Sequence, residues 1–321
     1  GPMRAVTMTA VNEIAAGERP DPEPGLDEVL VRVEASAVCR TDLQILRGDL
    51  AAHRLPLIPG HQVVGTEVDS GGRVGLVWLA QTCGHCRFCL SGRENLCDQA
   101  RFTGWDRDGG YAELVTAHRD FVHPLPEGDP HALAPLLCGG VIGFRALRVA
   151  GVGPDSAGQR VGFYGFGASA TIALQVARFW GCETYVVTRS EPEVQRALEL
   201  GATWAGTYDR PLPVRLDAAI TFAPSGDVVV AALQALDKGG TVAINAIHLD
   251  RIPQFDYDDL WWERSLRSVA NVTRQDVRDF LALVPAAGVR TQYETLPLER
   301  APEALRRLEA GDVRGAFVLT L

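Results

Sequence analysis

Residues 160–180 read RVGFYGFGASATIALQVARFW, which is a short apolar run, a glycine-rich turn and a helical run. The turn, Gly165-Phe-Gly167-Ala168-Ser169-Ala170, has the pattern Gly-x-Gly-x-x-Ala in the order strand, turn, helix. Small residues there let the backbone approach a pyrophosphate, and the helix N-terminus supplies N–H donors and positive potential. The stretch therefore predicts a dinucleotide site rather than an ordinary tight turn.

The residues around this turn alternate between apolar strands and helices. Further strands are expected at 183–188, 216–222, 240–246 and 265–270, with helices at 193–200 and 228–237. Near-continuous apolar strands that alternate with helices indicate a parallel sheet covered on both faces. The part before about residue 140 instead alternates polar and apolar residues between proline- and glycine-rich breaks, which predicts a mainly β domain.

Length and charge limit the classes of protein that fit. The 321 residues favour two domains, and the formal net charge of −9 disfavours nucleic acid and anionic membranes as partners. No apolar run reaches the roughly 18 residues of a membrane span, and no signal-peptide pattern opens the chain. We therefore expect a cytoplasmic protein that acts on a small molecule.

Four of the seven cysteines fall in one short segment, Cys83-Gly-His-Cys86-Arg-Phe-Cys89 followed by Cys97. Four thiolates in one loop complete a tetrahedron around Zn²⁺ and leave no place for water, so the spacing predicts a structural zinc site. An iron–sulfur cluster fits less well, because the ferredoxin run places its fourth cysteine closer and before a proline. Four unligated thiols are also disfavoured in a polar loop.

Cys39, His61 and Cys138 are candidates for a second metal site. Each alone is more often a packed residue than a ligand. Together they form a Cys₂His set that leaves one zinc position open, as chemistry at a metal requires.

With these segments and Asp108-Gly-Gly-Tyr-Ala-Glu113, the chain resembles the zinc-containing alcohol dehydrogenases of the medium-chain dehydrogenase/reductase superfamily over nearly its whole length. The resemblance implies an α/β protein with a GroES-like β domain and a Rossmann domain. The GroES-like domain would comprise residues 1–138 and 269–321, and the Rossmann domain residues 139–268.

The resemblance also implies site residues. Cys39, His61 and Cys138 would bind the catalytic zinc, Thr41 would hydrogen-bond the alcohol oxygen, and Asp42 would orient His61. Relatives often have a proton-relaying His five residues after the first ligand and a Glu after the ligand His, whereas this chain has Gln44 and Gln62. Because Gln cannot take up that proton, we expect proton delivery through Thr41, the cofactor ribose and water, or an enzyme that works mainly as a reductase.

The expected cofactor is a nicotinamide dinucleotide. NAD enzymes place an acid at the end of the second strand, but here the strand ends Thr188-Arg189-Ser190, and Arg189 could bind a 2′-phosphate. The sequence thus favours NADP(H) over NAD(H), against the alternative that Arg189 is only a solvated cation.

The predicted function is hydride transfer between NAD(P)(H) and a primary or secondary alcohol, or its aldehyde or ketone, in an enzyme with two Zn²⁺ per chain. One alternative is an NADPH-dependent imine or iminium reductase of the same fold, which has less need of the missing relay. Another is a non-catalytic, zinc-stabilised binding protein. The substrate-pocket candidates are Leu46, Trp78 and Trp105, which the resemblance supports, and Leu114, which is chosen by its position relative to the motifs. A homodimer or homotetramer is expected.

Overall fold

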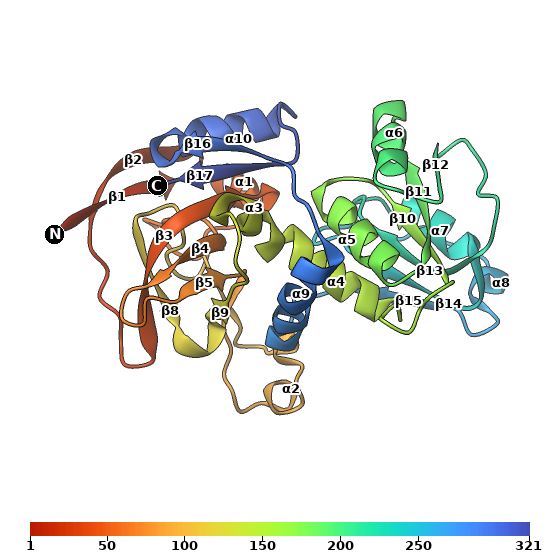
Figure 1. Cartoon of the computed structure of the whole chain (residues 1–321), viewed down its shortest axis with the longest axis horizontal. Helices are drawn as coiled ribbons and strands as arrows, with labels where there is room; N and C mark the ends of the chain where they lie inside the picture. Colours follow the sequence, from red (N-terminus) through yellow and green to blue (C-terminus); the bar gives the residue numbers. More distant parts are fainter. The chain divides into compact units, whose positions relative to one another are not determined.

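The computed structural model describes residues 1–321, and the chain folds into two compact units (Figure 1). Unit 1 comprises Gly1–Cys138, Asn271–Ala282 and Arg290–Leu321, and unit 2 comprises Gly139–Ala270 and Leu283–Val289. No single helix is both long enough and apolar enough to cross a membrane.

Unit 1 is built on a seven-stranded sheet in the order β16-β17-β3-β4-β5-β9, with β8 also paired to β3. Its strands are β3 (Glu28–Val38), β4 (Gln62–Glu67), β5 (Arg73–Leu76), β8 (Leu114–His118), β9 (His123–Pro124), β16 (Tyr293–Pro297) and β17 (Ala316–Thr320). β17 lies antiparallel to β3 with Phe317 opposite Val38, so the end of the chain completes the sheet begun near its start. Along β3, Val31 and Val33 are buried while Arg32 between them is exposed, the alternation expected of a strand with one face on a core.

Shorter elements surround this sheet. A hairpin of β1 (Pro2–Ala10) and β2 (Glu13–Pro20) forms a second sheet, and β6 (Leu79–Gln81) pairs with β7 (Arg101–Phe102). The helices of unit 1 are α1 (Arg40–Arg47), α2 (Arg87–Leu90), α3 (Pro130–Leu133) and α10 (Ala301–Glu309), and α9 (Arg274–Ala287) begins in unit 1. Four short 3₁₀ turns complete it: η1 (Glu94–Leu96), η2 (Arg119–Phe121), η3 (Ala134–Leu137) and η4 (Leu298–Arg300).

Unit 2 is a six-stranded, all-parallel sheet in the order β12-β11-β10-β13-β14-β15. Its strands are β10 (Arg160–Tyr164), β11 (Glu183–Thr188), β12 (Trp204–Thr207), β13 (Leu216–Thr221), β14 (Leu236–Ile244) and β15 (Ser265–Ser268). Its helices are α4 (Gly139–Val149), α5 (Ala168–Phe179), α6 (Glu191–Glu199), α7 (Gly226–Gln234) and α8 (Tyr257–Leu260). Counted along the chain, the strand order is 3-2-1-4-5-6, that of a dinucleotide-binding Rossmann sheet. The predicted α/β class with a parallel-sheet domain is confirmed.

The boundary predicted between a helix at 228–237 and a strand at 240–246 is wrong, because β14 begins at Leu236. The helix expected at 228–237 stops at Gln234, and Leu236 already pairs with Leu216 as the first residue of β14. Leu236 is fully buried in the sheet core, so strand pairing outweighs the continued helical pattern of the sequence.

Candidate metal centres and cofactor site

The structure brings Cys39, His61 and Cys138 together in unit 1. Cys39 follows β3, and His61 precedes β4. Because Ala37 pairs with Gln62 across these two strands, both ligands lie at the same end of the strand pair. Cys138 follows η3, and its sulfur lies 3.9 Å from that of Cys39. The three ligand atoms all lie within 4.8 Å of one another. This thiol, imidazole and thiol set fits Zn²⁺ with one coordination position open.

Asp42 is hydrogen-bonded to two of the three ligand residues, His61 and Cys39. Its carboxylate bonds to His61 Nδ1 at 3.0 Å and accepts hydrogen bonds from the Tyr111 hydroxyl at 2.8 Å and the Cys39 backbone N–H at 3.1 Å. Asp42 is 1% exposed, and Asp42 together with His61 and Tyr111 is buried. Since Nδ1 is engaged by Asp42, Nε2 of His61 is left for a metal.

The charges of the triad also suit a cation. Burial disfavours the charged form of His61, but the charge and hydrogen bond of Asp42 outweigh it and raise the pKa of His61 to about 10. A hydrogen bond from the Cys138 thiol, opposed by burial, holds the pKa of Cys39 well below its ordinary value. A buried carboxylate beside an easily ionised thiol is an environment that a dication neutralises.

The loop that carries His61 packs against the Asp108-Gly-Gly-Tyr motif. Gly109 N–H donates to Ile58 O at 2.7 Å, and Tyr111 N–H donates to Pro59 O at 2.9 Å. A Cβ on Gly109 would lie 1.9 Å from Gly60 O, and Gly60 itself has φ of +102°. Only glycine fits such an approach, so the motif fixes the loop from which His61 extends. Tyr111 is a functional residue that the sequence reasoning missed, although its position in this motif was the available signal.

The other predicted residues of this region lie on α1 and around it. Thr41, in the first turn of α1, is 6% exposed, and Gln44 is half-buried one turn later. Leu46 is 4% exposed and belongs to the core of unit 1, so it offers little surface to a ligand. Trp78 contacts His61 edge-on with ring centroids 4.9 Å apart, and Trp105 stacks with Trp78 at 5.6 Å.

The four cysteines of residues 83–97 converge as a second ligand set, with all four sulfurs within 4.8 Å of one another. Backbone N–H groups point at these sulfurs: His85 N–H and Cys86 N–H at Cys83, and Cys89 N–H at Cys86, over 3.3–3.5 Å. The N–H of His85 is the largest cause that lowers the pKa of Cys83, to about 6. The His85 side chain is exposed. Such N–H···S bonds favour thiolates, the form that binds zinc.

In unit 2, the glycine-rich turn joins β10 to α5. Gly165 has φ of +101°, and a Cβ there would lie 3.4 Å from the Phe222 side chain. Gly167 is the N-cap of α5, and nothing lies within 4 Å of the position its Cβ would take, so the backbone there is open to a ligand. Ala168 and Ala170 follow in the first turn, where the helix N–H groups are free to bind phosphate. The Ser169 hydroxyl donates to Gly139 O at 2.7 Å.

A carboxylate from α6 reaches the end of β11, and the sequence reasoning missed it although Ser190-x-x-Glu193 is the spacing of a capping box. Glu193, in the first turn of α6, accepts hydrogen bonds from the Thr188 and Ser190 hydroxyls, each at 3.0 Å. Its carboxylate also lies 3.7 Å from the guanidinium of Arg189, whose side chain is 87% exposed. The strand end therefore presents both a cation and an acid.

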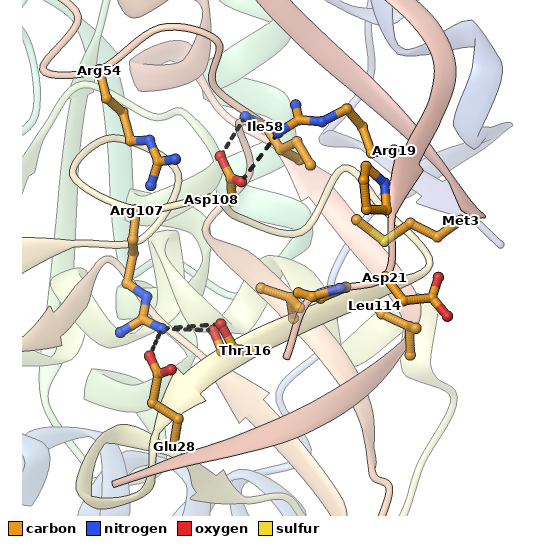
Figure 2. Close-up of a pocket in the computed structure, with 13 residues that line it drawn as sticks. Met3, Arg19, Asp21, Glu28, Arg54, Ile58, Arg107, Asp108, Leu114 and Thr116 are labelled. Atoms are coloured by element: carbon orange, nitrogen blue, oxygen red, sulfur yellow. Dashed lines mark hydrogen bonds and ion pairs between the residues drawn. The ribbon is translucent and has the colours of Figure 1, made fainter. Parts of the chain in front are cut away.

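A pocket of about 490 Å³ lies elsewhere in unit 1, and Figure 2 shows its lining. Arg19 faces Asp108 at 3.9 Å, and Arg107 pairs with Glu28 and Thr116. Of the predicted site residues only Leu114, a substrate-pocket candidate, lines it, and no predicted metal or cofactor residue does. Because no candidate metal ligand lines it, the pocket is separate from both metal sites.

Comparison with known proteins places the chain in a family. The family model of the alcohol dehydrogenase GroES-like domain matches residues 25–127, and that of the zinc-binding dehydrogenase domain matches residues 170–286. The probable alcohol dehydrogenase AdhA of Mycobacterium tuberculosis is 48% identical over 317 residues, which cover 94% of this chain and 90% of that protein. An alcohol dehydrogenase of Geobacillus stearothermophilus is 37% identical over 328 residues, which cover 96% of this chain and 95% of that protein.

Among solved structures, the cobalt- and zinc-bound thermostable alcohol dehydrogenase from Pyrobaculum aerophilum matches with a TM-score of 0.89. The match covers 100% of both chains at 23% identity, which shows a common fold. The chain belongs to the zinc-type alcohol dehydrogenases of the medium-chain dehydrogenase/reductase superfamily. It is an oxidoreductase of the zinc-dependent, NAD(P)-using class. The predicted family, the GroES-like and Rossmann domains and the enzyme class are thereby confirmed.

Proposed function

We propose that this chain binds two zinc ions and interconverts alcohols with aldehydes or ketones, with NADP(H) as the preferred cofactor. Cys39, His61 and Cys138 would hold the catalytic zinc. The structural zinc would be held by Cys83, Cys86, Cys89 and Cys97. The observation that carries the proposal is the convergence of three ligand side chains, Cys39, His61 and Cys138, with the buried Asp42 hydrogen-bonded to His61.

The surrounding residues would divide the work. When bound, the catalytic zinc supplies a Lewis acid that polarises a carbonyl or lowers the pKa of an alcohol, and the nicotinamide supplies or accepts the hydride. Asp42 holds His61 in the tautomer that presents Nε2, and Tyr111 holds Asp42. The Thr41 hydroxyl would accept the proton of a bound alcohol in the oxidation direction and would donate a proton to the carbonyl oxygen in the reduction direction. Gln44, lacking a basic nitrogen, would serve only as a hydrogen-bonding neighbour, so the proton would pass from Thr41 through the cofactor ribose to water.

The test is one assay series with metal analysis on the same sample. We expect about two zinc ions per chain and NADPH oxidation with aldehydes in the wild-type protein. Cys138→Ala should retain about one zinc and lose activity by at least a hundredfold. Absence of activity in a wild-type sample that holds two zinc ions would contradict the proposal.

The preference for NADP(H) is proposed from Arg189, whose exposed guanidinium is available to a 2′-phosphate at the end of β11. Glu193 would compete with the 2′-phosphate for the Arg189 guanidinium, so Arg189→Ala and Glu193→Gln form a matched pair of variants with opposite expected effects. Arg189→Ala should raise KM for NADPH by at least about tenfold and leave KM for NADH unchanged, since a charge-assisted hydrogen bond contributes about 1.5–3 kcal/mol. Glu193→Gln should lower KM for NADPH. Comparable kcat/KM with NADH and NADPH in the wild type would reject the preference.

A second candidate is reduction of imines or iminium ions, which Gln44 favours because that chemistry depends less on the missing relay. Adding cyclic imines to the assay series decides between the two. A kcat/KM for an imine well above that for every aldehyde would favour this candidate.

The remaining expectations are also proposals. The division into residues 1–138 with 269–321 and residues 139–268 stays a prediction, as does a cytoplasmic location. A homodimer or homotetramer is supported by the exposed pair Trp261 and Trp262 on unit 2, which are 48% and 49% exposed. Light scattering after size-exclusion chromatography measures this directly, and a mass of one chain would contradict it.

A further inference from the structure

The pocket of about 490 Å³ in unit 1 is lined by arginines and apolar side chains together (Figure 2). Its walls come from β1, the end of β2, the start of β3, the strand β8 and the loops that precede β4 and β8. A volume of this size is typical of sites that bind small organic molecules. No candidate metal ligand lines the pocket, so a ligand could occupy it independently of the catalytic triad.

Two of the three arginines in the lining are only partly engaged by acids. Arg107 forms an ion pair with Glu28 and donates to the backbone and hydroxyl oxygens of Thr116, each at 3.2 Å. All of these contacts use Nη2, which leaves the other two nitrogens of the Arg107 guanidinium without a partner. Arg19 lies 3.9 Å from Asp108, a separation that is too long for a hydrogen bond.

The third arginine, Arg54, is not engaged at all. It is exposed, and no ion pair or hydrogen bond holds its guanidinium, which Figure 2 shows without a dashed line to any neighbour. All five N–H donors of this side chain are therefore available to a ligand.

The charges of the lining do not cancel. Of the three acids that border the pocket, Glu28 and Asp108 each face an arginine, whereas Asp21 forms an ion pair with the N-terminal ammonium at 3.4 Å. Three guanidiniums therefore stand against two acids, which leaves one positive charge in excess. Since the whole chain has a formal net charge of −9, this excess is a local feature and not part of a generally basic surface.

Apolar side chains supply another part of the lining. Met3, Ile58 and Val115 are buried residues that border the pocket, and Leu114 adds a partly buried one. A carbon chain placed against them would be removed from water, which favours a ligand with an apolar body over a bare inorganic ion.

We propose that this pocket binds a small aliphatic monocarboxylate, with the carboxylate group on Arg54 and the carbon chain against the apolar lining. A guanidinium matches a carboxylate through two parallel hydrogen bonds. One negative charge balances the excess cation, whereas a phosphate dianion would place a second negative charge beside Glu28 and Asp108. This ligand site is additional to the catalytic site and takes no part in hydride transfer.

The first test measures binding by calorimetry, with hexanoate as the probe. Because a carboxylate can also bind the catalytic zinc, the titration uses Cys138→Ala, which lacks one ligand of that metal, beside the zinc-loaded wild type. Hexanoate should bind Cys138→Ala with one molecule per chain. Acetate should bind at least about tenfold more weakly, since each buried methylene contributes up to about fourfold in affinity. Hexyl phosphate, in its dianionic form, should also bind more weakly than hexanoate.

Variants of Arg54 in the same Cys138→Ala background then locate the site. Arg54→Ala should raise Kd for hexanoate at least about tenfold, because a charge-assisted hydrogen bond is lost. Arg54→Lys keeps the charge without the planar fork, so its Kd should lie between the two. The control is Arg251→Ala in unit 2, which removes the same charge from a side chain that is 82% exposed and should leave Kd unchanged. Arg54 is exposed, so none of these variants should lower Tm in the absence of ligand.

Three outcomes would overturn the proposal. One is no binding of hexanoate to Cys138→Ala at millimolar concentrations. Another is an equal rise of Kd in Arg54→Ala and Arg251→Ala, which would show unspecific attraction to positive charge. The third is tighter binding of hexyl phosphate than of hexanoate, which would assign the pocket to phosphate esters instead. None of these outcomes bears on the proposed function, because the titrations measure binding with the catalytic triad disabled.

Discussion

At the residue scale, Asp42 is the side chain on which the triad depends most. It makes three hydrogen bonds from a fully buried position, to His61, Tyr111 and the backbone of Cys39. Asp42→Asn keeps the shape but removes the charge, and an amide cannot satisfy three donors. We expect zinc affinity at the triad to fall 10- to 100-fold, which a competitive chelator titration measures.

Tyr111→Phe is the matched control for this variant, because it removes one of the three hydrogen bonds and leaves the charge of Asp42 in place. Its zinc affinity should fall less than tenfold. If the two variants lose zinc equally, the negative charge is not what Asp42 supplies.

Individual contacts of functional residues were also the feature that the sequence predicted least well. The ligands Cys39, His61 and Cys138 could be picked out because the resemblance marks their segments. The roles of Tyr111 and Glu193 were not assigned from the sequence. Tyr111 contacts Asp42 from 69 residues away, so local spacing does not reveal the contact, and only its place in the Asp108-Gly-Gly-Tyr motif signals it. Glu193 lies three residues after Ser190 and five after Thr188, and the Ser-x-x-Glu spacing is that of a helix capping box, so a local signal was present there.

At the scale of elements, β9 carries a buried histidine whose charge the fold opposes. His123 is 3% exposed, and its Nε2 has no hydrogen-bond partner. Burial, with help from the nearby guanidiniums of Arg278 and Arg274, lowers the pKa of His123 to about 4. The unfolded chain therefore binds a proton near pH 6.5 that the folded chain refuses until about pH 4.

Above pH 6.5, His123 is neutral in both states and does not lower the free energy of unfolding. As the pH falls toward 4, the unfolded chain takes up the proton and the free energy of unfolding decreases. At pH 5 the loss amounts to about 2 kcal/mol. His123→Leu removes the titration, so urea unfolding should show its free energy of unfolding improving relative to the wild type by about that amount between pH 7 and pH 5. A constant difference between the two proteins at both pH values would contradict the assignment.

The elements themselves were largely predictable. Strands such as β10 and β11 are buried on both faces and are mainly apolar after their first residues, so their positions follow from the sequence. Helix ends were less certain, and the expected helix at 228–237 shows why. Its last residues, Gln234-Ala-Leu-Asp237, continue the helical pattern of the sequence, and only the pairing of Leu236 with Leu216 across the sheet places Leu236 in a strand.

At the scale of the whole molecule, the four-cysteine lobe connects distant parts of the chain. Glu94, in η1, accepts hydrogen bonds from both the backbone and the guanidinium of Arg274 at the start of α9, 180 residues away. The side chain of Glu94 is 6% exposed, so loss of Arg274 would leave a buried carboxylate without its charge partner. The Asn271 amide donates to Asn95 O. The structural zinc would thus fix Glu94 and Asn95, which bind the segment Asn271–Ala282 where the chain re-enters unit 1.

Loss of the structural zinc should therefore affect more than its own loop. Cys97→Ala is expected to leave about one zinc per chain and to expose residues 83–97 and the start of α9 to limited proteolysis, because Glu94 is no longer held beneath Arg274. The variant should keep most of its kcat, since the Cys39, His61 and Cys138 set remains, while its resistance to proteolysis falls. Cys39→Ala is the reciprocal variant: it should also leave about one zinc, with activity lost and the proteolytic pattern of the wild type retained. Identical cleavage patterns and activities in the two variants would show that the two zinc sites do not have the separate roles assigned to them.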